Sequence, residues 1–148
     1  FQPRGRKHTE DRKSARLEKF ARFVAPGVEL VDLQYGDVSA ERIAFDARHP
    51  GARTDVAGLD RFNDLDGVMA AIASCDFVVT TSNVTAHFGG VLGRPTYLVY
   101  LRANPPFHYW VPDGDGRSLW YPSVRIVTAP GIDTWEKAVA AADERLHA

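Results

Sequence analysis

Two short apolar runs, separated by the length of one helix, constrain the fold of this chain most. Residues 77–79 and 97–100 are continuously hydrophobic, which is typical of parallel strands that are covered on both faces. Between the runs, helical spacing predicts a helix that ends before Gly93 and Pro95, with Val84, Phe88, Val91 and Leu92 on its apolar stripe. Because parallel strands require a crossover connection, this segment predicts a strand–helix–strand unit.

The rest of the chain also alternates between strand and helix patterns. Strands are predicted at residues 28–33, near Val56 and at residues 124–127. Helices are predicted at about residues 12–25, 40–47, after Asp64 as the N-cap, and after a capping box of Asp133 with Glu136. The helix after Asp64 is expected to bury Leu65, Val68, Met69 and Ile72. This alternation predicts an α/β fold: a three-layer, Rossmann-like parallel sheet with helices on both faces, forming one domain over residues 1–148.

Composition limits the classes of partner. The net charge of −1 gives no general reason to expect nucleic acid or an anionic membrane as a partner, and no apolar run is long enough to cross a bilayer. The single cysteine, Cys75, excludes an intrachain disulfide and fits a reducing compartment, so a cytoplasmic location is expected. Because the chain starts with Phe1, it is expected to be either a processed protein or a fragment.

The turn between the strand at 77–79 and the following helix is rich in polar side chains. Ligands in open parallel sheets bind at the carboxyl ends of the strands, where the first amides of the next helix attract phosphate oxygens. Here those amides belong to residues 84–86, and the side chains able to add hydrogen bonds are Ser82, Asn83, Thr85 and, one turn further on, His87. The turn is therefore a candidate phosphate site.

Structural roles compete with this interpretation. Ser and Asn are ordinary N-caps, and the glycine pattern of dinucleotide sites and the P-loop motif are both absent. Gly89 and Gly90 either permit close packing of the helix on the sheet or approach a ligand. The aromatic residues Trp110, Trp120 and Tyr121 form either a stacking floor for a ligand or a cluster that pins a loop to the core.

Metal chemistry is not expected. The sequence Asp113-Gly-Asp-Gly116 lacks the terminal Glu of a twelve-residue calcium loop, which favours a simple turn. His108 has no neighbour at metal-ligand spacing. Cys75 is expected to pack as a small hydrophobic side chain.

Residues 76–96 resemble the strand, turn and helix of the C-terminal domain of GT-B glycosyltransferases. The similarity is greatest to the bacterial glycosyltransferases that follow tetratricopeptide repeats, and it is more distant to the lipopolysaccharide heptosyltransferases. Three further segments resemble the same group in the same order, namely residues 33–37 (LQYGD), 63–66 (NDLD) and 120–125 (WYPSVR). Together the similar segments cover most of the chain from about Leu30 to Val127.

The resemblance implies one half of a GT-B fold that binds a nucleoside-diphosphate sugar, the donor, without a metal or another cofactor. By resemblance, residues 83–86 surround the diphosphate, His87 lies near the phosphates or the ribose, and Asp37 or Glu41 holds the ribose hydroxyls. The implied donor-binding residues are Ser82, Asn83, Val84, Thr85, Ala86, His87, Gln34, Tyr35, Asp37 and Glu41. The partner domain, with the acceptor site and any catalytic base, is expected at the N-terminal side and is absent here.

The chain departs from the family pattern in two respects. Ser82 stands where heptosyltransferases carry an Asp. The first strand of the domain, an apolar run ending near a tryptophan, is expected either ahead of Phe1 or reduced to a remnant. The isolated chain is therefore expected to bind nucleotide weakly and to transfer no sugar. Two alternatives stay open, a non-catalytic nucleotide-binding or sensory module and a sugar-nucleotide epimerase of the same overall fold.

Overall fold

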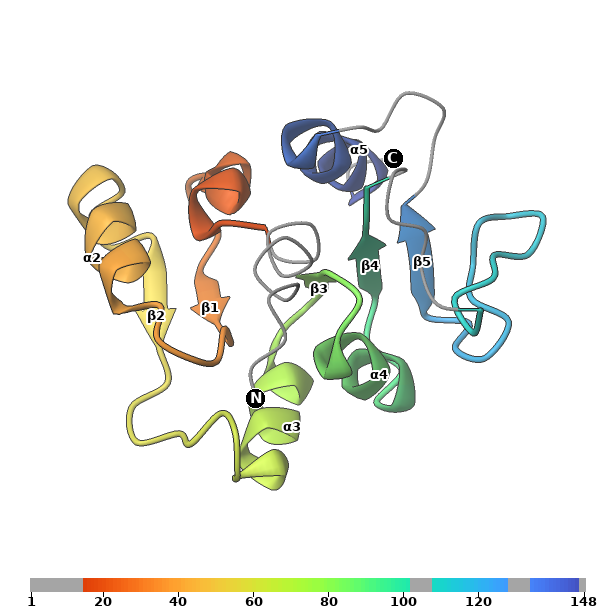
Figure 1. The fold of residues 1–148 in the computed structure, drawn as a ribbon, viewed down its shortest axis with the longest axis horizontal. Helices are drawn as coiled ribbons and strands as arrows, with labels where there is room; N and C mark the ends of the chain where they lie inside the picture. The colour runs from red at the N-terminus through yellow and green to blue at the C-terminus, as the bar shows by residue number, and fades with distance from the viewer. Residues whose placement is uncertain (1–14, 102–107, 128–133, 147–148) are drawn as a thin grey trace, which may run out of the picture.

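Short parallel strands alternate with helices along the chain, as the sequence predicts. The computed structural model describes residues 15–101, 108–127 and 134–146. In chain order the elements are η1 (Leu17–Phe23), β1 (Leu30–Asp32), α2 (Ser39–Arg48), β2 (Arg53–Asp55), α3 (Leu65–Ser74), β3 (Val78–Thr80), α4 (Val84–Val91), β4 (Thr96–Val99), β5 (Val124–Val127) and α5 (Trp135–Leu146). The α/β class is thus confirmed, with parallel sheets flanked by helices in an arrangement that fits a Rossmann-like layout (Figure 1).

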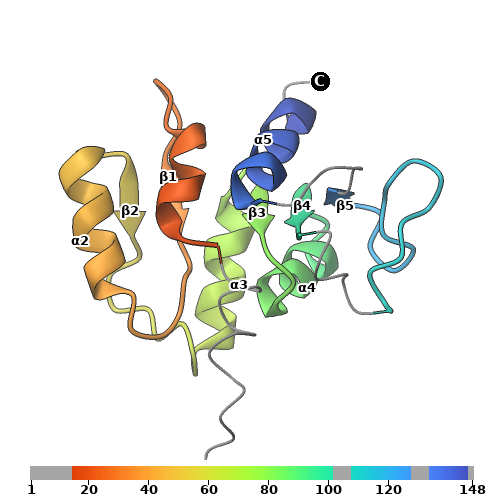
Figure 2. The same ribbon diagram turned by 45° about the horizontal axis from the view of Figure 1, so that its top comes forward.

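The strands form two hydrogen-bonded ladders. β1 pairs with β2 in parallel, and β3, β4 and β5 form a parallel three-stranded sheet with β4 in the middle. In the views of Figures 1 and 2, β1 lies between β2 and β3. Within the described part of the chain, no ladder joins β1 to β3. In the described residues, the one continuous sheet that the sequence predicts is therefore present as two pieces, with no ladder between β1 and β3.

The central strand β4 is buried on both faces. Leu98 packs in a cluster with Ala86 of α4, whereas Tyr97 and Val99 pack in another cluster with Val139 of α5. Since neighbouring residues of a strand point to opposite faces, α4 and α5 cover opposite faces of β4. This arrangement confirms that the apolar run at residues 97–100 marks a doubly covered parallel strand.

The first helical segment differs from its prediction. Instead of an amphipathic α-helix over residues 12–25, the described residues form a 3₁₀ helix, η1, and residues 12–14 lie outside the described ranges. The bonds from Lys19 N–H to the Arg16 carbonyl and from Val24 N–H to the Ala21 carbonyl span three residues, the 3₁₀ pattern. The predicted stop is confirmed, because Gly27 adopts a positive φ of 81°.

Helix α4 follows the predicted apolar stripe in part: Phe88 and Leu92 pack against a core cluster of Val68, Ile72 and Val78. Val84 and Val91 are 46% and 64% exposed, so the sequence assignment of these two residues to the core face was wrong. The helix instead buries its small residues, Thr85, Ala86 and Gly89. A Cβ atom on Gly89 would collide with the Thr96 side chain in β4, which confirms that this glycine permits close contact between helix and sheet.

Helix α3 begins as predicted. The Asp64 carboxylate accepts a hydrogen bond from Gly67 N–H at 2.9 Å, and Val68 and Ile72 are buried. Leu65 is 51% exposed, however, so its predicted burial was wrong. At the start of α5 the predicted capping residue Asp133 lies outside the described residues.

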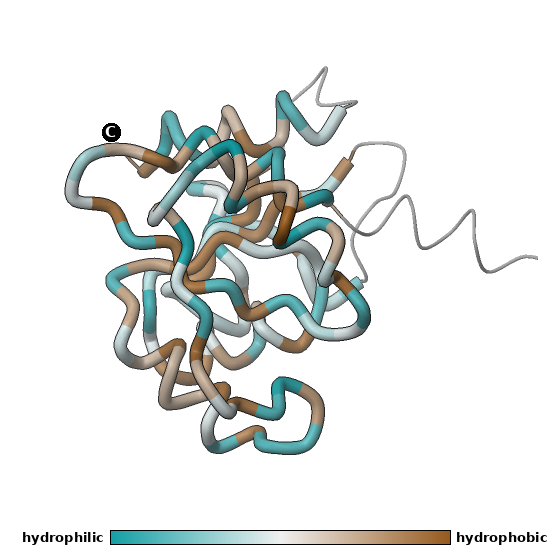
Figure 3. The backbone as a smooth tube through the Cα atoms, turned by 90° about the vertical axis from the view of Figure 1, so that its left-hand side faces the viewer, coloured by the Kyte–Doolittle hydropathy of each residue, from teal (hydrophilic) through white to brown (hydrophobic). Residues whose placement is uncertain are grey.

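Hydrophobic residues are spread over many short segments. In Figure 3 the hydrophobic colouring is broken into brief stretches by hydrophilic residues. None of the helices in the described ranges is both long and apolar enough to cross a membrane.

Candidate functional site

The turn between β3 and α4 is held by Asn83. Its Oδ1 atom accepts hydrogen bonds from Thr85 N–H at 2.9 Å and from the Thr80 hydroxyl at 3.1 Å, and its Nδ2 atom lies 3.4 Å from Thr81 Oγ1. Ala86 N–H donates to the Asn83 carbonyl at 3.2 Å. Asn83 is therefore the N-cap of α4, and its side chain fixes the turn from both sides.

The surface of this turn is smaller than the sequence suggests. Thr85 is 9% exposed and Ala86 fully buried, so their side chains face the core. Ser82 is partly exposed and Val84 is exposed. A ligand could contact the turn through the Ser82 hydroxyl, the surface of Val84 and the positive end of the α4 dipole.

His87 lies among aromatic rings. Its ring centroid is 4.6 Å from that of Trp110, 5.4 Å from Tyr109 and 5.7 Å from Tyr121, and its Nδ1 atom is 3.3 Å from the Tyr121 hydroxyl. We refer to these four residues as the aromatic cluster. Burial lowers the pKa of His87 below its usual value, which favours the neutral imidazole near pH 7. His87 would therefore meet a phosphate as a neutral hydrogen-bonding group rather than as a cation.

The lowered pKa predicts a pH-dependent stability. Because unfolded His87 binds a proton more readily than folded His87, the free energy of unfolding should fall as the pH drops below about 6.5 and through the folded-state pKa. Replacing His87 with Gln should flatten this dependence, which urea unfolding followed by circular dichroism at pH 5–8 would measure. The matched control is His108→Gln, at an exposed position. The prediction would be contradicted if the free energy of unfolding depended on pH equally in His87→Gln and in the wild type.

The second group of predicted residues lies between β1 and α2. Gln34 N–H donates to Asp32 Oδ1 at 2.8 Å. The Glu41 Oε2 atom accepts from Leu17 N–H at 3.2 Å and lies 3.4 Å from Gln34 Nε2. Tyr35 instead is 49% exposed, and its ring lies 6.4 Å from that of Phe62. The structure thus brings Gln34 and Glu41 together and turns Tyr35 away.

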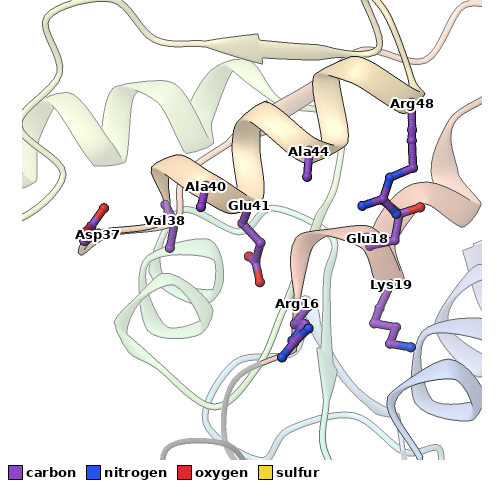
Figure 4. A pocket seen from close by; sticks show the side chains of 9 residues that line it. All are labelled: Arg16, Glu18, Lys19, Asp37, Val38, Ala40, Glu41, Ala44 and Arg48. Atoms are coloured by element: carbon purple, nitrogen blue, oxygen red, sulfur yellow. The ribbon is translucent and has the colours of Figure 1, made fainter.

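A pocket of about 580 Å³ lies between η1 and α2 (Figure 4). In Figure 4 the Glu41 side chain points from α2 toward η1, whereas Asp37 lies on the chain just ahead of the start of α2. The lining residues are Arg16, Glu18, Lys19, Asp37, Val38, Ala40, Glu41, Ala44 and Arg48. Two of the cations are paired, Lys19 with Glu136 and Arg48 with Glu18. Asp37 and Glu41 therefore both line this pocket, although they lie at different places along it.

The two groups of predicted residues remain separate. No hydrogen bond, ion pair or ring contact among the described residues connects the turn after β1 with the turn after β3. Both groups follow the carboxyl ends of their strands. In the described ranges, no group of three or more His, Cys, Asp and Glu side chains is placed to hold a metal ion.

Other candidates have structural roles. The Asp113 carboxylate accepts hydrogen bonds from the N–H groups of Asp115 and Arg117, both at 2.8 Å, which confirms the predicted turn. The Cys75 thiol donates to the Ala71 carbonyl at 3.3 Å, and burial raises its pKa. The thiol is therefore protonated near neutral pH, which lowers its nucleophilicity.

The sequence analysis missed one buried charge. Asp32 closes β1 with a side chain that is only 1% exposed, and its Oδ2 atom lies 2.6 Å from Arg42 Nε. The sequence signal that could have predicted this buried charge is an aspartate, Asp32, at the end of an otherwise apolar strand. Its partner, ten residues further on, is brought close only by the packing of α2.

A comparison with known proteins finds a similarity to a bacterial protein. The chain is 36% identical over 112 residues to Protein FlbA of Caulobacter vibrioides, a match that covers 75% of this chain and 18% of FlbA. No protein-family model and no solved structure matches. The chain therefore spans about a fifth of the length of the curated relative that it matches.

Proposed function

We propose that this chain is the donor-binding half of a GT-B glycosyltransferase and holds a nucleoside-diphosphate sugar. The observation that carries the proposal is the capped turn of residues 81–83, which follows β3 and opens α4 beside the central strand β4. Its position at the carboxyl end of a parallel strand is where α/β sheets bind ligands. The ordered resemblance of residues 30–127 to GT-B donor domains supports the same assignment.

In this proposal the two groups of residues contact different parts of one donor. The diphosphate lies against the start of α4, where the helix dipole and the Ser82 hydroxyl stabilise negative charge. The ribose lies toward Glu41, whose Oε2 atom is held by Leu17 and Gln34. The remaining carboxylate oxygen of Glu41 would then accept a ribose hydroxyl.

The proposal also implies a further strand that joins the two pieces of the sheet. A three-layer GT-B half has one continuous parallel sheet, whereas the ladders described here do not join β1 and β3, which are neighbours in the views of Figures 1 and 2. The first strand that the resemblance expects ahead of Phe1 would lie between them. Because helix η1 precedes β1, such a strand would form a parallel strand–helix–strand unit with β1.

The chemical contribution of this half would be electrostatic. As the bond between sugar and diphosphate breaks, negative charge grows on the diphosphate, and the oriented dipoles at the start of α4 would stabilise it. The acceptor and any catalytic base would come from the N-terminal domain. This chain alone should therefore bind donor nucleotides without transferring sugar.

Substitutions of Asn83 test the proposal. Ser and Asp are both good N-caps, so Asn83→Ser and Asn83→Asp should each retain stability to within about 1 kcal/mol. Asn83→Asp, however, adds a negative charge where the diphosphate would lie, and we expect it to weaken nucleotide binding by about tenfold or more. Asn83→Ser should stay within about threefold of the wild type. Calorimetric titration with UDP, GDP, ADP and CMP would measure both effects.

The outcome separates the proposal from a capping role alone. Saturable binding of one nucleotide that Asn83→Asp weakens and Asn83→Ser retains would support a phosphate site at this turn. Equal affinities in all three proteins, or no binding to the folded wild type at millimolar nucleotide, would contradict it.

A second candidate function is a nucleotide-binding module without transfer activity. It is favoured by Ser82, which provides no carboxylate where heptosyltransferases carry an Asp. A longer natural chain that includes the N-terminal domain would separate the two candidates, since only a transferase would release nucleotide from a donor in an acceptor-dependent manner.

A further inference from the structure

Asp32 and Arg42 hold the backbone of Gln34 from both sides. The Asp32 Oδ1 atom accepts Gln34 N–H at 2.8 Å, and Arg42 Nη2 donates to the Gln34 carbonyl at 2.8 Å. The two side chains are joined by the contact of 2.6 Å between Arg42 Nε and Asp32 Oδ2. We call this arrangement the Gln34 clamp.

The clamp is anchored in the interior. The Asp32 side chain is 1% exposed, and that of Arg42 19% exposed. Arg53 Nη1 lies 3.5 Å from the same Asp32 oxygen, and Arg61 Nε donates to the Asp32 carbonyl at 3.1 Å. A charge-assisted bond in such a setting is both stronger and more rigid than one in water.

Gln34 transmits this rigidity to the pocket. Its side-chain amide lies 3.4 Å from Glu41 Oε2, the same atom that accepts Leu17 N–H. Glu41 is thereby held between the start of η1 and the turn after β1, at the wall of the pocket in Figure 4. The position of its carboxylate therefore depends on the position of Gln34.

A second ion pair on α2, between Asp46 and Arg53, does not contact the backbone of Gln34. Arg53 Nε and Nη2 contact the two carboxylate oxygens of Asp46 at 2.9 and 2.5 Å. This pair also links α2 to β2. It shares Arg53 with the surroundings of Asp32, but neither Asp46 nor Arg53 forms a hydrogen bond with Gln34 or Glu41, and Asp46→Asn keeps all residues of the clamp and Arg53 itself. Asp46 therefore provides a matched control.

We propose that Asp32 and Arg42 are positioning residues that set the Glu41 carboxylate for a ribose hydroxyl. This inference rests on the proposed function. The inference extends the proposed function, because it assigns the selectivity for ribonucleotides over deoxyribonucleotides to the Gln34 clamp, which does not touch the ligand. The preference arises because a 2′-deoxyribose leaves the oriented carboxylate without its donor.

The test compares nucleotides that differ by one hydroxyl. For the tightest-binding nucleotide among UDP, GDP, ADP and CMP, the wild type should bind the ribose form about tenfold more tightly than its 2′-deoxy form, as expected for one hydrogen bond to a charged group. Arg42→Lys keeps the charge but loses the fork between Asp32 and Gln34. It should reduce this ratio to about threefold or less, whereas Asp46→Asn should leave the ratio unchanged.

Amide hydrogen exchange gives a readout without ligand. Arg42→Lys should accelerate exchange at Gln34 N–H by about tenfold, and Asp46→Asn should not. An unchanged ribose preference together with unchanged Gln34 exchange in Arg42→Lys would overturn the clamp. If the wild type binds no nucleotide, the proposed function fails, and amide exchange alone tests whether the clamp holds Gln34. Faster exchange at Gln34 N–H only in Arg42→Lys would support the clamp. Equal exchange rates in Arg42→Lys and Asp46→Asn would overturn it.

Discussion

Replacing Trp110 with alanine is expected to destabilise the protein by about 3–5 kcal/mol, the usual range for truncating a large buried aromatic side chain. Trp110 is 1% exposed and packs in one cluster with Leu98 of β4 and with Val124 and Ile126 of β5. Its ring also contacts His87. The substitution would leave a cavity between the sheet and α4, so the midpoint of urea unfolding, followed by circular dichroism, should fall sharply.

Trp120 provides the matched control. It is 72% exposed, so Trp120→Ala should change the free energy of unfolding by no more than about 0.5 kcal/mol. Similar losses for the two tryptophans would contradict the separation of a core tryptophan from a surface tryptophan in this loop.

The second large effect is expected from Gly90→Val in α4. A Cβ atom at this position would lie 2.7 Å from Cδ1 and 2.8 Å from Cβ of Tyr121. The Cβ of Tyr121 is attached to the backbone and cannot swing away, so the added side chain must displace either α4 or the loop. Overpacking of this kind costs about 1–3 kcal/mol, occasionally more, and urea unfolding would measure it.

Gly114→Val separates overpacking from the general cost of adding a side chain. Nothing lies within 4 Å of a Cβ atom at Gly114, so this variant should stay within about 0.5 kcal/mol of the wild type. If Gly90→Val were equally mild, the close approach of α4 to Tyr121 would be wrong.

The parts of the fold that the sequence predicts well are those with an unambiguous hydrophobic period. The run at residues 97–100 marks β4 because a strand covered on both faces has no polar side to alternate. The core face of α4 was harder to predict. Phe88 and Leu92 pack against the core as predicted, but the helix also approaches the sheet through Gly89, which carries no hydrophobic side chain, and the two valines of the predicted stripe are exposed.

Long-range contacts account for most of what the sequence could not predict about the site. The polar turn of residues 80–85 and its capping residue follow from local patterns, since an N-cap bonds to amides two or three positions away. The surroundings of His87 come instead from Tyr109, Trp110 and Tyr121, residues more than twenty positions away. Likewise, the Gln34 clamp depends on the packing of α2 beside β1. Donor binding by these residues stays a prediction.

The central claim, that a nucleoside diphosphate binds at the start of α4, is tested most directly by NMR titration of the ¹⁵N-labelled chain with UDP, GDP, ADP and CMP. We expect one nucleotide to shift the amide resonances of residues 82–87 and of Glu41 in a saturable manner. The claim would be contradicted if the folded protein showed no shifts at millimolar nucleotide, or only shifts elsewhere, such as in the exposed turn around Asp113.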